Sequence, residues 1–160
     1  MTDDPKRPYA RFQFLSRMTS AVRLDVRTYE EVRTDHTATL QALAVVLLAA
    51  LATGTGLQAG LGFLPQYAIS WIINWLAWVL VIYLLGTTLF ATPETDADWG
   101  QLVRTAGFAQ APAVFNVFGI IPIIGPTGHF GLVVVVTTWL FVAMAVAVRI
   151  ARAFSGRDRV

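Results

Sequence analysis

The side chains best suited to chemistry in this 160-residue chain are its two histidines, because cysteine is absent. His36 stands just before a long uncharged stretch, and His129 lies in a turn-rich segment much further along. Neither has another histidine or a carboxylate three or four residues away on an apolar helix, which is the spacing that a helical metal site needs. Each could act alone as an axial ligand to haem iron or chlorophyll magnesium, although a hydrogen-bonding histidine at an interface is the commoner role. We therefore expect no metal site, and keep His36 and His129 only as weak candidates for binding pigment or haem.

No arrangement typical of an enzyme active site is present. The absence of cysteine excludes disulfides, thiolate metal sites, iron–sulfur clusters and cysteine nucleophiles. No glycine-rich loop joins a strand to a helix, so a phosphate-binding loop is not predicted. A Ser–His–Asp arrangement is also not predicted, because the two histidines are expected on opposite sides of a membrane. We expect no catalytic residues.

Among the amide side chains of the long apolar stretches, the candidates for buried polar groups are Gln58, Asn74, Gln110 and Asn116. No carboxylate accompanies them there, which argues against a proton relay, because such relays place an ionisable group within the membrane. Buried amides in membrane proteins more often bridge helices than bind a substrate. A small transporter or channel component that uses Gln110 and Asn116 stays open as an alternative function.

The distribution of charge identifies the class of protein. Residues 36–93 and 105–148, which together make up 102 of the 160 positions, contain no Asp, Glu, Lys or Arg. A soluble domain needs a polar face on nearly every element, whereas a membrane span needs about 20 predominantly apolar residues. Each uncharged run can hold two spans. The sequence therefore predicts an all-α polytopic membrane protein, and its interleaved acids and bases argue against a nucleic-acid partner.

Four transmembrane helices are expected, at about 39–60, 66–90, 102–124 and 130–150, within a membrane domain of residues 38–152. The first carries Ala52, Gly56 and Gly60 at four-residue steps, a small-residue stripe that allows another helix to pack closely. The second carries its aromatic side chains mainly in its first half. Trp71 and Trp75 are expected at the membrane interface, whereas Trp78 is expected to pack inside the protein.

The third span is expected to be broken. Gly107 and Pro112 interrupt it, and an internal proline leaves a helix carbonyl without its partner, so a kink near 108–112 is predicted. Its second half is expected to be re-entrant or partly unwound. The preceding loop, 91–100, contains an acidic cluster (Glu94, Asp96 and Asp98) that could bind a cation or basic partner, or cap the helix and pair with Arg104.

Residues 1–37 are expected to form a leader with an amphipathic helix from Arg11, which Leu24-Asp25 could interrupt. This helix could lie in the headgroup plane with its arginines towards anionic lipid, or pack on the ends of the spans. Residues 153–160 form a short basic tail. Lys and Arg are concentrated in these two end segments, which places both termini in the cytoplasm. No cleavable signal peptide is expected, and the arginine-, alanine- and valine-rich composition suggests a bacterial inner-membrane protein.

Three stretches resemble the Ypt-interacting-protein (YIP) domain family: the lead-in at 24–35, the run through 98–112 with its Arg-Thr-x-Gly-Phe-Ala-x-Ala-Pro motif, and the closing pattern at 139–149. The resemblance implies an all-helical membrane domain of the bacterial branch, without catalytic residues. It makes Arg104, Gly107 and Pro112 structural determinants of the kinked span. Eukaryotic members bind prenylated Rab GTPases, a role that does not transfer to bacteria, and members often have five spans rather than four.

The leading interpretation is a non-enzymatic membrane scaffold or accessory subunit that contacts membrane lipids and other integral membrane proteins, and that could belong to a larger complex. No cofactor is expected beyond bound lipid. The residues expected to matter for structure and interaction are Ala52, Gly56, Gly60, Trp71, Trp75, Trp78, Arg104, Gly107, Gln110, Pro112 and Asn116. The two alternatives are the transporter or channel component, and a pigment- or haem-associated subunit of a photosynthetic or electron-transfer complex.

Overall fold

The computed structural model describes residues 7–58, 60–88, 98–121 and 125–153, and every regular element within these ranges is a helix. In chain order the elements are α1 (Arg7–Val22), α2 (Val26–Thr34), α3 (Ala38–Gly56), α4 (Leu64–Thr88), α5 (Trp99–Phe108), the 3₁₀ helix η1 (Ala111–Ile120) and α6 (Gly125–Ala153). The predicted all-helical architecture is confirmed for this part of the chain.

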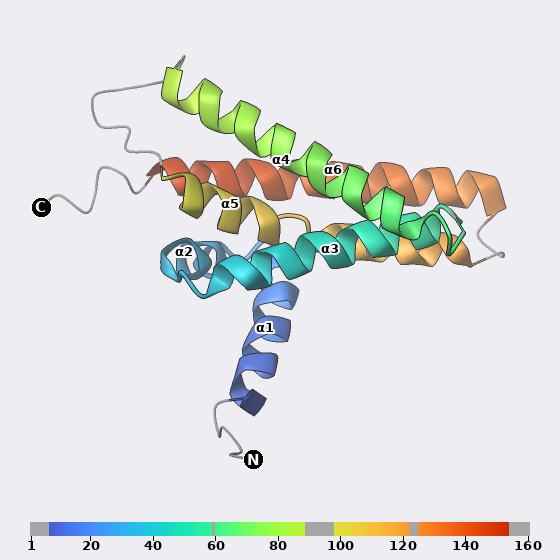
Figure 1. Cartoon of the computed structure of the whole chain (residues 1–160), viewed down its shortest axis with the longest axis horizontal. Coiled ribbons are helices and arrows are strands. Elements are labelled where there is room, and N and C mark those ends of the chain that lie inside the picture. Colours follow the sequence, from blue (N-terminus) through green and yellow to red (C-terminus); the bar gives the residue numbers. More distant parts are fainter. Residues whose placement is uncertain (1–6, 59, 89–97, 122–124, 154–160) are drawn as a thin grey trace, which may run out of the picture.

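Three of the helices are long and apolar enough to cross a membrane: α3, α4 and the stretch Thr127–Ile150 of α6. They run along the long axis of the molecule, and α4 tilts away from the others towards its C-terminal end (Figure 1). At 1.5 Å per residue, the 19 residues of α3 extend for about 28 Å, close to the thickness of the hydrocarbon layer. These helices correspond to the predicted spans 39–60, 66–90 and 130–150, with ends displaced by a few residues.

The predicted span 102–124 is instead divided into two helices of different type. The α-helix α5 ends at Phe108, and η1 begins at Ala111. The bonding pattern changes at Gln110, whose backbone N–H donates to the carbonyl of Gly107 rather than to a residue four positions back (3.1 Å). Pro112 has no N–H and its ring would clash with the carbonyl of Phe108 in a continuous α-helix. The break therefore falls where Pro112 predicts it.

Close packing of α3 against α5 and η1 depends on small residues. A Cβ added at Gly56 would lie 1.8 Å from the backbone oxygen of Asn116, and one added at Gly107 would lie 2.7 Å from the Cβ of Ala42. Ala52 and Gly56 are both buried on α3, as the small-residue stripe predicts. The prediction for Gly60 is wrong: α3 ends at Gly56, and Gly60 is an exposed turn residue with φ of +78°.

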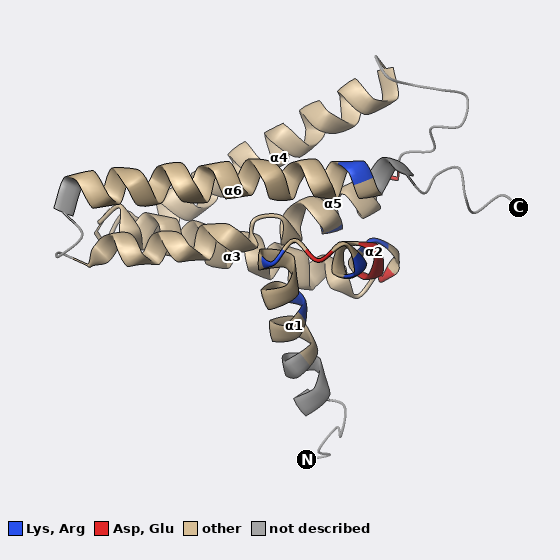
Figure 2. Cartoon of the chain, turned by 180° about the vertical axis from the view of Figure 1, so that it is seen from behind, with Lys and Arg blue, Asp and Glu red and all other residues tan. Residues whose placement is uncertain are grey.

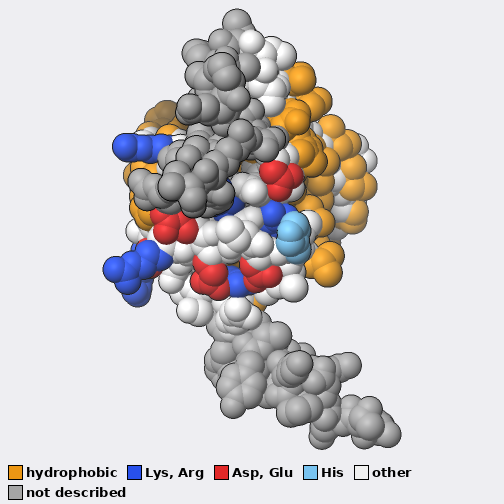
Figure 3. All heavy atoms as spheres, turned by 90° about the vertical axis from the view of Figure 1, so that its left-hand side faces the viewer, with side chains coloured by type: hydrophobic (Ala, Val, Ile, Leu, Met, Phe, Trp, Pro, Cys, Tyr) orange, Lys and Arg blue, Asp and Glu red, His pale blue; other side chains and the backbone are white. Residues whose placement is uncertain are grey.

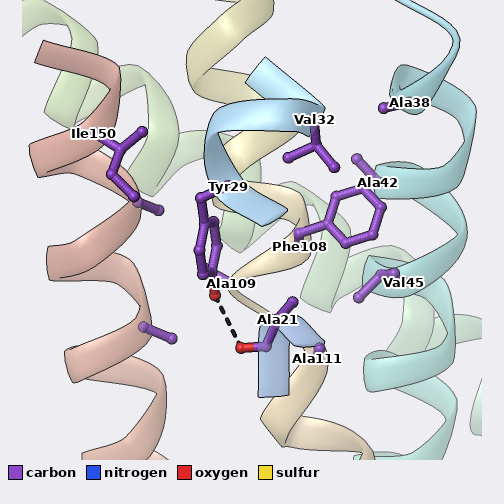
Figure 4. Close-up of a cluster of buried hydrophobic side chains, with 12 residues drawn as sticks. Ala21, Tyr29, Val32, Ala38, Ala42, Val45, Phe108, Ala109, Ala111 and Ile150 are labelled. Atoms are coloured by element: carbon purple, nitrogen blue, oxygen red, sulfur yellow. Dashed lines mark hydrogen bonds between the residues drawn. The ribbon is translucent and has the colours of Figure 1, made fainter. Parts of the chain in front are cut away.

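A cluster of buried apolar side chains joins the N-terminal end of α3 to its neighbours (Figure 4). Tyr29 and Val32 of α2 are fully buried there beside Phe108 of α5. The Tyr29 hydroxyl donates to the carbonyl of Ala21 in α1 (3.2 Å). Burial raises the pKa of Tyr29, so this hydroxyl stays protonated and keeps its role as donor.

The N-terminal segment forms two helices rather than one. Leu24 adopts a left-handed conformation (φ +59°), and the N–H groups of Leu24 and Asp25 donate to the carbonyls of Ala21 and Ser20, which closes the end of α1. α1 then projects from the side of the bundle, across the direction of α3 (Figure 1). The interruption at Leu24-Asp25 is therefore present. A single apolar stripe is not, because Leu15 and Val26 are about half exposed (54% and 48%).

Trp75 and Trp78 of α4 lie the opposite way round from the prediction. Trp75 is buried (3% exposed) and its indole N–H points at the carbonyl of Ala106 (3.4 Å), whereas Trp78 is 60% exposed. The inward face of α4 carries Ala68, Trp75 and Val79, at steps of seven and four. Trp78 lies about 100° from Val79 around the helix, which turns it away from that face.

Candidate functional site

Charged side chains in the described part of the chain gather at one end of the bundle, which we call the polar end: α2, the first two turns of α5 and the last turns of α6 (Figure 2). Arg17 of α1 and Arg23, which follows α1, lie beside them. Seen end-on, acidic and basic side chains occupy this end, while hydrophobic side chains cover the flank (Figure 3). The rest of α3, α4 and α6 carries no charge.

Arg17 joins three helices at the polar end. Its guanidinium donates to the carboxylate of Glu31 on α2 (Nε to Oε1, 3.0 Å), to Asp35 after α2 (Nη2 to Oδ2, 2.7 Å) and to the amide oxygen of Gln41 on α3 (3.0 Å). We call these four residues the Arg17 clasp. Arg17 is only 4% exposed, so its charge is neutralised within the protein. A guanidinium that is held by two carboxylates fixes the direction in which α1 leaves the bundle.

The charges of the clasp stabilise one another. Burial is the largest single influence and lowers the pKa of Arg17, but the hydrogen bonds and the charge attraction of Glu31 and Asp35 together outweigh it and raise the pKa. The hydrogen bond from the Thr37 hydroxyl (2.6 Å), followed by that from Arg17, lowers the pKa of Asp35 to about 2. Both side chains are therefore fully ionised at neutral pH, which keeps the clasp closed.

Arg104 holds α2 against α5. Its Nε and Nη2 both donate to the backbone carbonyl of Arg33 in the last turn of α2 (3.1 and 2.7 Å). Carbonyls at a helix C-terminus lack intrahelical partners and carry partial negative charge, so a buried guanidinium suits this position. The carboxylate of Asp98 lies 3.9 Å away. Gly100 leaves the room for the side chain, because a Cβ there would lie 3.1 Å from Nη1 of Arg104.

Further contacts order the start of α5. Asp98 is its N-cap and accepts from the backbone N–H of Gly100 (3.0 Å). Arg33 also reaches across from α2, donating to the side-chain oxygen of Gln101 (3.2 Å). The acidic residues Glu94 and Asp96 of the predicted cluster lie outside the described residues.

The predicted site residues of the broken span are buried, but they do not form one site. Arg104 lies at the polar end, Gly107 packs on α3, and Gln110 and Pro112 are buried around the break. Asn116 lies far along η1 and donates to the hydroxyl of Thr53 in α3 (3.1 Å). Its other amide atom, Oδ1, is buried without a hydrogen-bond partner in the structure. Asn116 therefore bridges helices through one half of its amide.

The two histidines lie at opposite ends of α3, as expected. His36 is exposed just before α3 begins. His129 lies near its far end: a Cβ added at Gly119 would be 2.7 Å from Nδ1 of His129 and 2.8 Å from the carbonyl oxygen of Gly56. Within the described ranges, no group of three or more histidine or carboxylate side chains is placed to hold a metal ion.

Sequence reasoning missed the Arg17 clasp and the buried position of Arg33. The headgroup alternative for the leader placed its arginines towards lipid, whereas Arg17 and Arg33 are both more than nine-tenths buried, which suits the other alternative of packing against the spans. One signal was present for Arg17: it falls on the same helical stripe as Phe14, Met18 and Ala21, at steps of three and four. A cation on an apolar stripe indicates a buried ion pair.

Comparison with family models matches the chain to the Yip1 domain over residues 24–160. Neither the curated proteins nor the solved structures include a significant match to this chain. The match spans α2 to α6 together with the C-terminal residues, so it includes the Arg104 contact and the α5–η1 break.

Proposed function

The chain belongs to the Yip1 domain family of membrane proteins, and from this we propose that it is a non-enzymatic scaffold or accessory subunit of a bacterial inner membrane. The observation that carries the proposal is the contrast between its inner and outer helices. α3 and the α5–η1 segment pack tightly together, whereas α4 and α6 leave most of their apolar length exposed. The exposed side chains include Ile69, Ile73 and Leu84 on α4 and Phe130, Val135 and Phe141 on α6. Such long faces suit contact with lipid and with other membrane proteins.

We propose that the chain crosses the bilayer four times, with the α5–η1 segment as the third crossing. The ten residues of α5 cover about 15 Å at 1.5 Å per residue, and the ten residues of η1 about 20 Å at 2.0 Å per residue. Together they exceed the roughly 30 Å of the hydrocarbon layer. An even number of crossings puts both termini on one side, and the positive-inside rule makes that side the cytoplasm.

α1 is proposed to lie in the membrane plane at the cytoplasmic surface. Support comes from its direction, across the axis of the spanning helices, and from the Arg17 clasp that fixes this direction (Figure 1). Leu15, which is 54% exposed, would then enter the outer part of the bilayer. Lipid is accordingly one of the proposed partners.

Partner binding can be tested by purifying a tagged full-length chain, expressed at native abundance, from its own membranes in polymer nanodiscs. We expect a second protein at near-stoichiometric amount. Replacing Phe130 and Phe141 with alanine should reduce recovery of a partner bound to α6, while Leu40→Ala, an equally exposed change on α3, serves as the control. Recovery of the chain alone, or only with copies of itself, would refute the accessory role.

A transporter or channel component remains the second candidate, favoured by the unpartnered Oδ1 of Asn116 on a discontinuous segment. Discontinuous helices supply polar groups to substrate sites in transporters. This function predicts that Asn116→Ala or Gln110→Ala abolishes solute flux into liposomes without unfolding the protein, while Gln58→Ala, at an exposed position, leaves flux unchanged. Equal flux in all three variants, or none in the native chain, would count against it.

A further inference from the structure

Asn74 is a polar side chain on the outward face of a helix that we place across the membrane. It is the eleventh of the 25 residues of α4, which puts it about 3 Å from the helix midpoint. Its side chain is exposed, and the structure gives its amide no hydrogen-bond partner in the described chain. Near the centre of a bilayer no water is available to satisfy an amide, so an unpaired Asn74 carries a free-energy cost.

The face around Asn74 allows another helix to approach. Ser70 and Ala77, about one turn to either side, are exposed and small, and Val81 continues the same stripe at steps of four, three and four. The inward face of α4, with Ala68, Trp75 and Val79, lies on the other side of the helix. The Ser70 hydroxyl donates to the carbonyl of Gln66 in its own helix (2.9 Å), which leaves Asn74 as the group that lacks a partner. Small residues beside one polar residue are typical of helix–helix contacts in membranes.

We propose that α4 pairs with α4 of a second copy of this chain, with the two Asn74 amides facing each other. An amide has both an acceptor oxygen and a donor NH₂ group, so two copies related by a two-fold axis satisfy each other reciprocally. Lipid tails offer no hydrogen bonds. A charged partner finds no complementary charge, because α4 has none along its length. The self-complementary amide therefore favours a second copy. The inference requires α4 to cross the bilayer, and it is independent of the accessory role proposed above.

The strength of pairing can be measured with purified full-length protein in liposomes that contain no other protein, by energy transfer between differently labelled Thr34→Cys copies at increasing lipid dilution. We expect the native chain to dimerise and Asn74→Leu to dimerise roughly ten-fold more weakly, since a hydrogen bond between helices in a membrane is worth about 1–2 kcal/mol in model peptides. Asn74→Gln, which keeps donor and acceptor, should retain most of the pairing. Thr137→Leu, an exposed mid-helix polar residue of α6, is the matched control and should change nothing. A monomeric native chain, or equal dimerisation of Asn74→Leu, overturns the proposal.

The geometry can be tested separately by cross-linking, because the chain has no native cysteine. Single cysteines at Ser70 or Ala77 should form disulfide dimers in these liposomes under mild oxidation, whereas Leu47→Cys, on the exposed side of α3, should not. Ala77→Leu, which adds bulk to the stripe without touching the amide, should weaken dimerisation. Ala77→Leu therefore tests the α4 interface even if Asn74→Leu proves unstable. Equal cross-linking from Leu47, or unaltered dimerisation of Ala77→Leu, would show that this face of α4 is not the interface.

Discussion

Arg104 illustrates how a buried cation is accommodated beside a membrane domain without a close carboxylate. Two of its nitrogens donate to a single backbone carbonyl of α2, and Asp98 lies at the outer limit of an ion pair. The interaction is between a charge and a helix end, so it depends on the position of α2 and not on the side chain of Arg33. Removal of the guanidinium leaves a carbonyl of the last turn without its partner.

Arg104→Gln is expected to lower the free energy of unfolding by about 1–3 kcal/mol, because a buried carbonyl loses its charged donor. The free energy of unfolding of Arg104→Lys should lie between those of the native chain and Arg104→Gln, since one ammonium cannot reproduce the paired contact of Nε and Nη2. The measurement is thermal or denaturant unfolding in detergent. Arg149→Gln, at an exposed position, is the control and should remain within about 0.5 kcal/mol of the native chain. A similar loss in both variants would contradict the role assigned to Arg104.

Gly56→Ala is expected to disrupt the contact between α3 and η1. The added Cβ would overlap the backbone oxygen of Asn116, which cannot move as a side chain can. Overpacking of this kind costs about 1–3 kcal/mol or more, and should appear as a lower unfolding temperature. Gly131→Ala in α6 has nothing within 4 Å and should be neutral or slightly stabilising, so it separates packing from helix propensity. Unchanged stability of Gly56→Ala would show that the close approach is not required.

At the scale of single residues, the sequence singled out Gly56, Arg104 and Gly107 as structural residues, and all three are buried, but it did not single out Arg17. The motif residues stand out because glycine, proline and arginine are rare within apolar stretches. Arg17 was misplaced because its partners, Glu31 and Asp35, lie beyond the break at Leu24, and a continuous helical wheel cannot bring them back against it. Trp78 was misplaced for a related reason: the depth of a residue in a span does not tell which way it faces.

Between elements, the decisive feature of the N-terminal region is the turn at Leu24. A leucine in the left-handed conformation costs roughly 1–2 kcal/mol relative to the ordinary region. The side chain of Leu24 packs against the buried cluster, and this contact holds the residue in that conformation. The turn directs α1 back so that Arg17 meets Glu31 and Asp35, which are 14 and 18 residues later in the sequence.

The Arg17 clasp should weaken in acid. The folded-state pKa of Asp35 is about 2, below its unfolded value of 3.8, so its contribution is present above about pH 4 and is lost as the pH falls towards 2. Asp35→Asn should weaken the clasp already at neutral pH, by about 1 kcal/mol, because a charge-assisted hydrogen bond is replaced by a neutral one. A spin label at Ser16→Cys would report this as greater mobility of α1.

The control for this experiment is Glu30→Gln, which removes a carboxylate from α2 outside the clasp. In the Glu30→Gln variant, the spin label at Ser16→Cys should be as immobile at neutral pH as it is in the native chain. If Asp35→Asn leaves the mobility unchanged at pH 7, or if the native chain shows no increase between pH 4 and pH 2, Asp35 does not anchor α1.

The elements themselves were predictable to different degrees. Uncharged length locates α3, α4 and α6, because the hydrophobic thickness of a bilayer sets how many apolar residues a span needs. Pro112 locates the end of α5, because the proline ring excludes a continuous α-helix. The 3₁₀ form of η1 was not predictable, since it depends on how closely Gly56 lets the backbone approach α3. The projection of α1 follows from the clasp and is likewise a tertiary effect.

In the molecule as a whole, α3 is the central helix and the two longest helices lie outside it. The polar end closes one side of the bundle through contacts among α1, α2, α3 and α5. In the described residues the opposite end has no ion pair, and its polar contact is the Asn116–Thr53 hydrogen bond. The molecule is therefore asymmetric along its long axis, as expected for a protein whose two sides meet different solutions.

The four-crossing topology predicts which positions share a side. Because the chain lacks native cysteine, single cysteines at Thr34, Gly62, Thr95 and Gly128 can each be tested with a membrane-impermeant thiol reagent in intact cells. Gly62→Cys and Gly128→Cys should be labelled from outside, and Thr34→Cys and Thr95→Cys only after the membrane is opened. Labelling of Gly62→Cys and Thr95→Cys from the same side would contradict the topology.

The break between α5 and η1 also bears on how the protein enters the membrane during synthesis. Residues 99–120 include a buried arginine and a buried asparagine, and neither half is a long apolar helix that could partition into lipid on its own. Their partners, the Arg33 carbonyl and the Thr53 hydroxyl, belong to helices that leave the ribosome earlier. The order of the chain thus supplies the acceptors before the groups that need them. We therefore expect insertion of this segment to require that α2 and α3 are already in place, because these helices supply the acceptors.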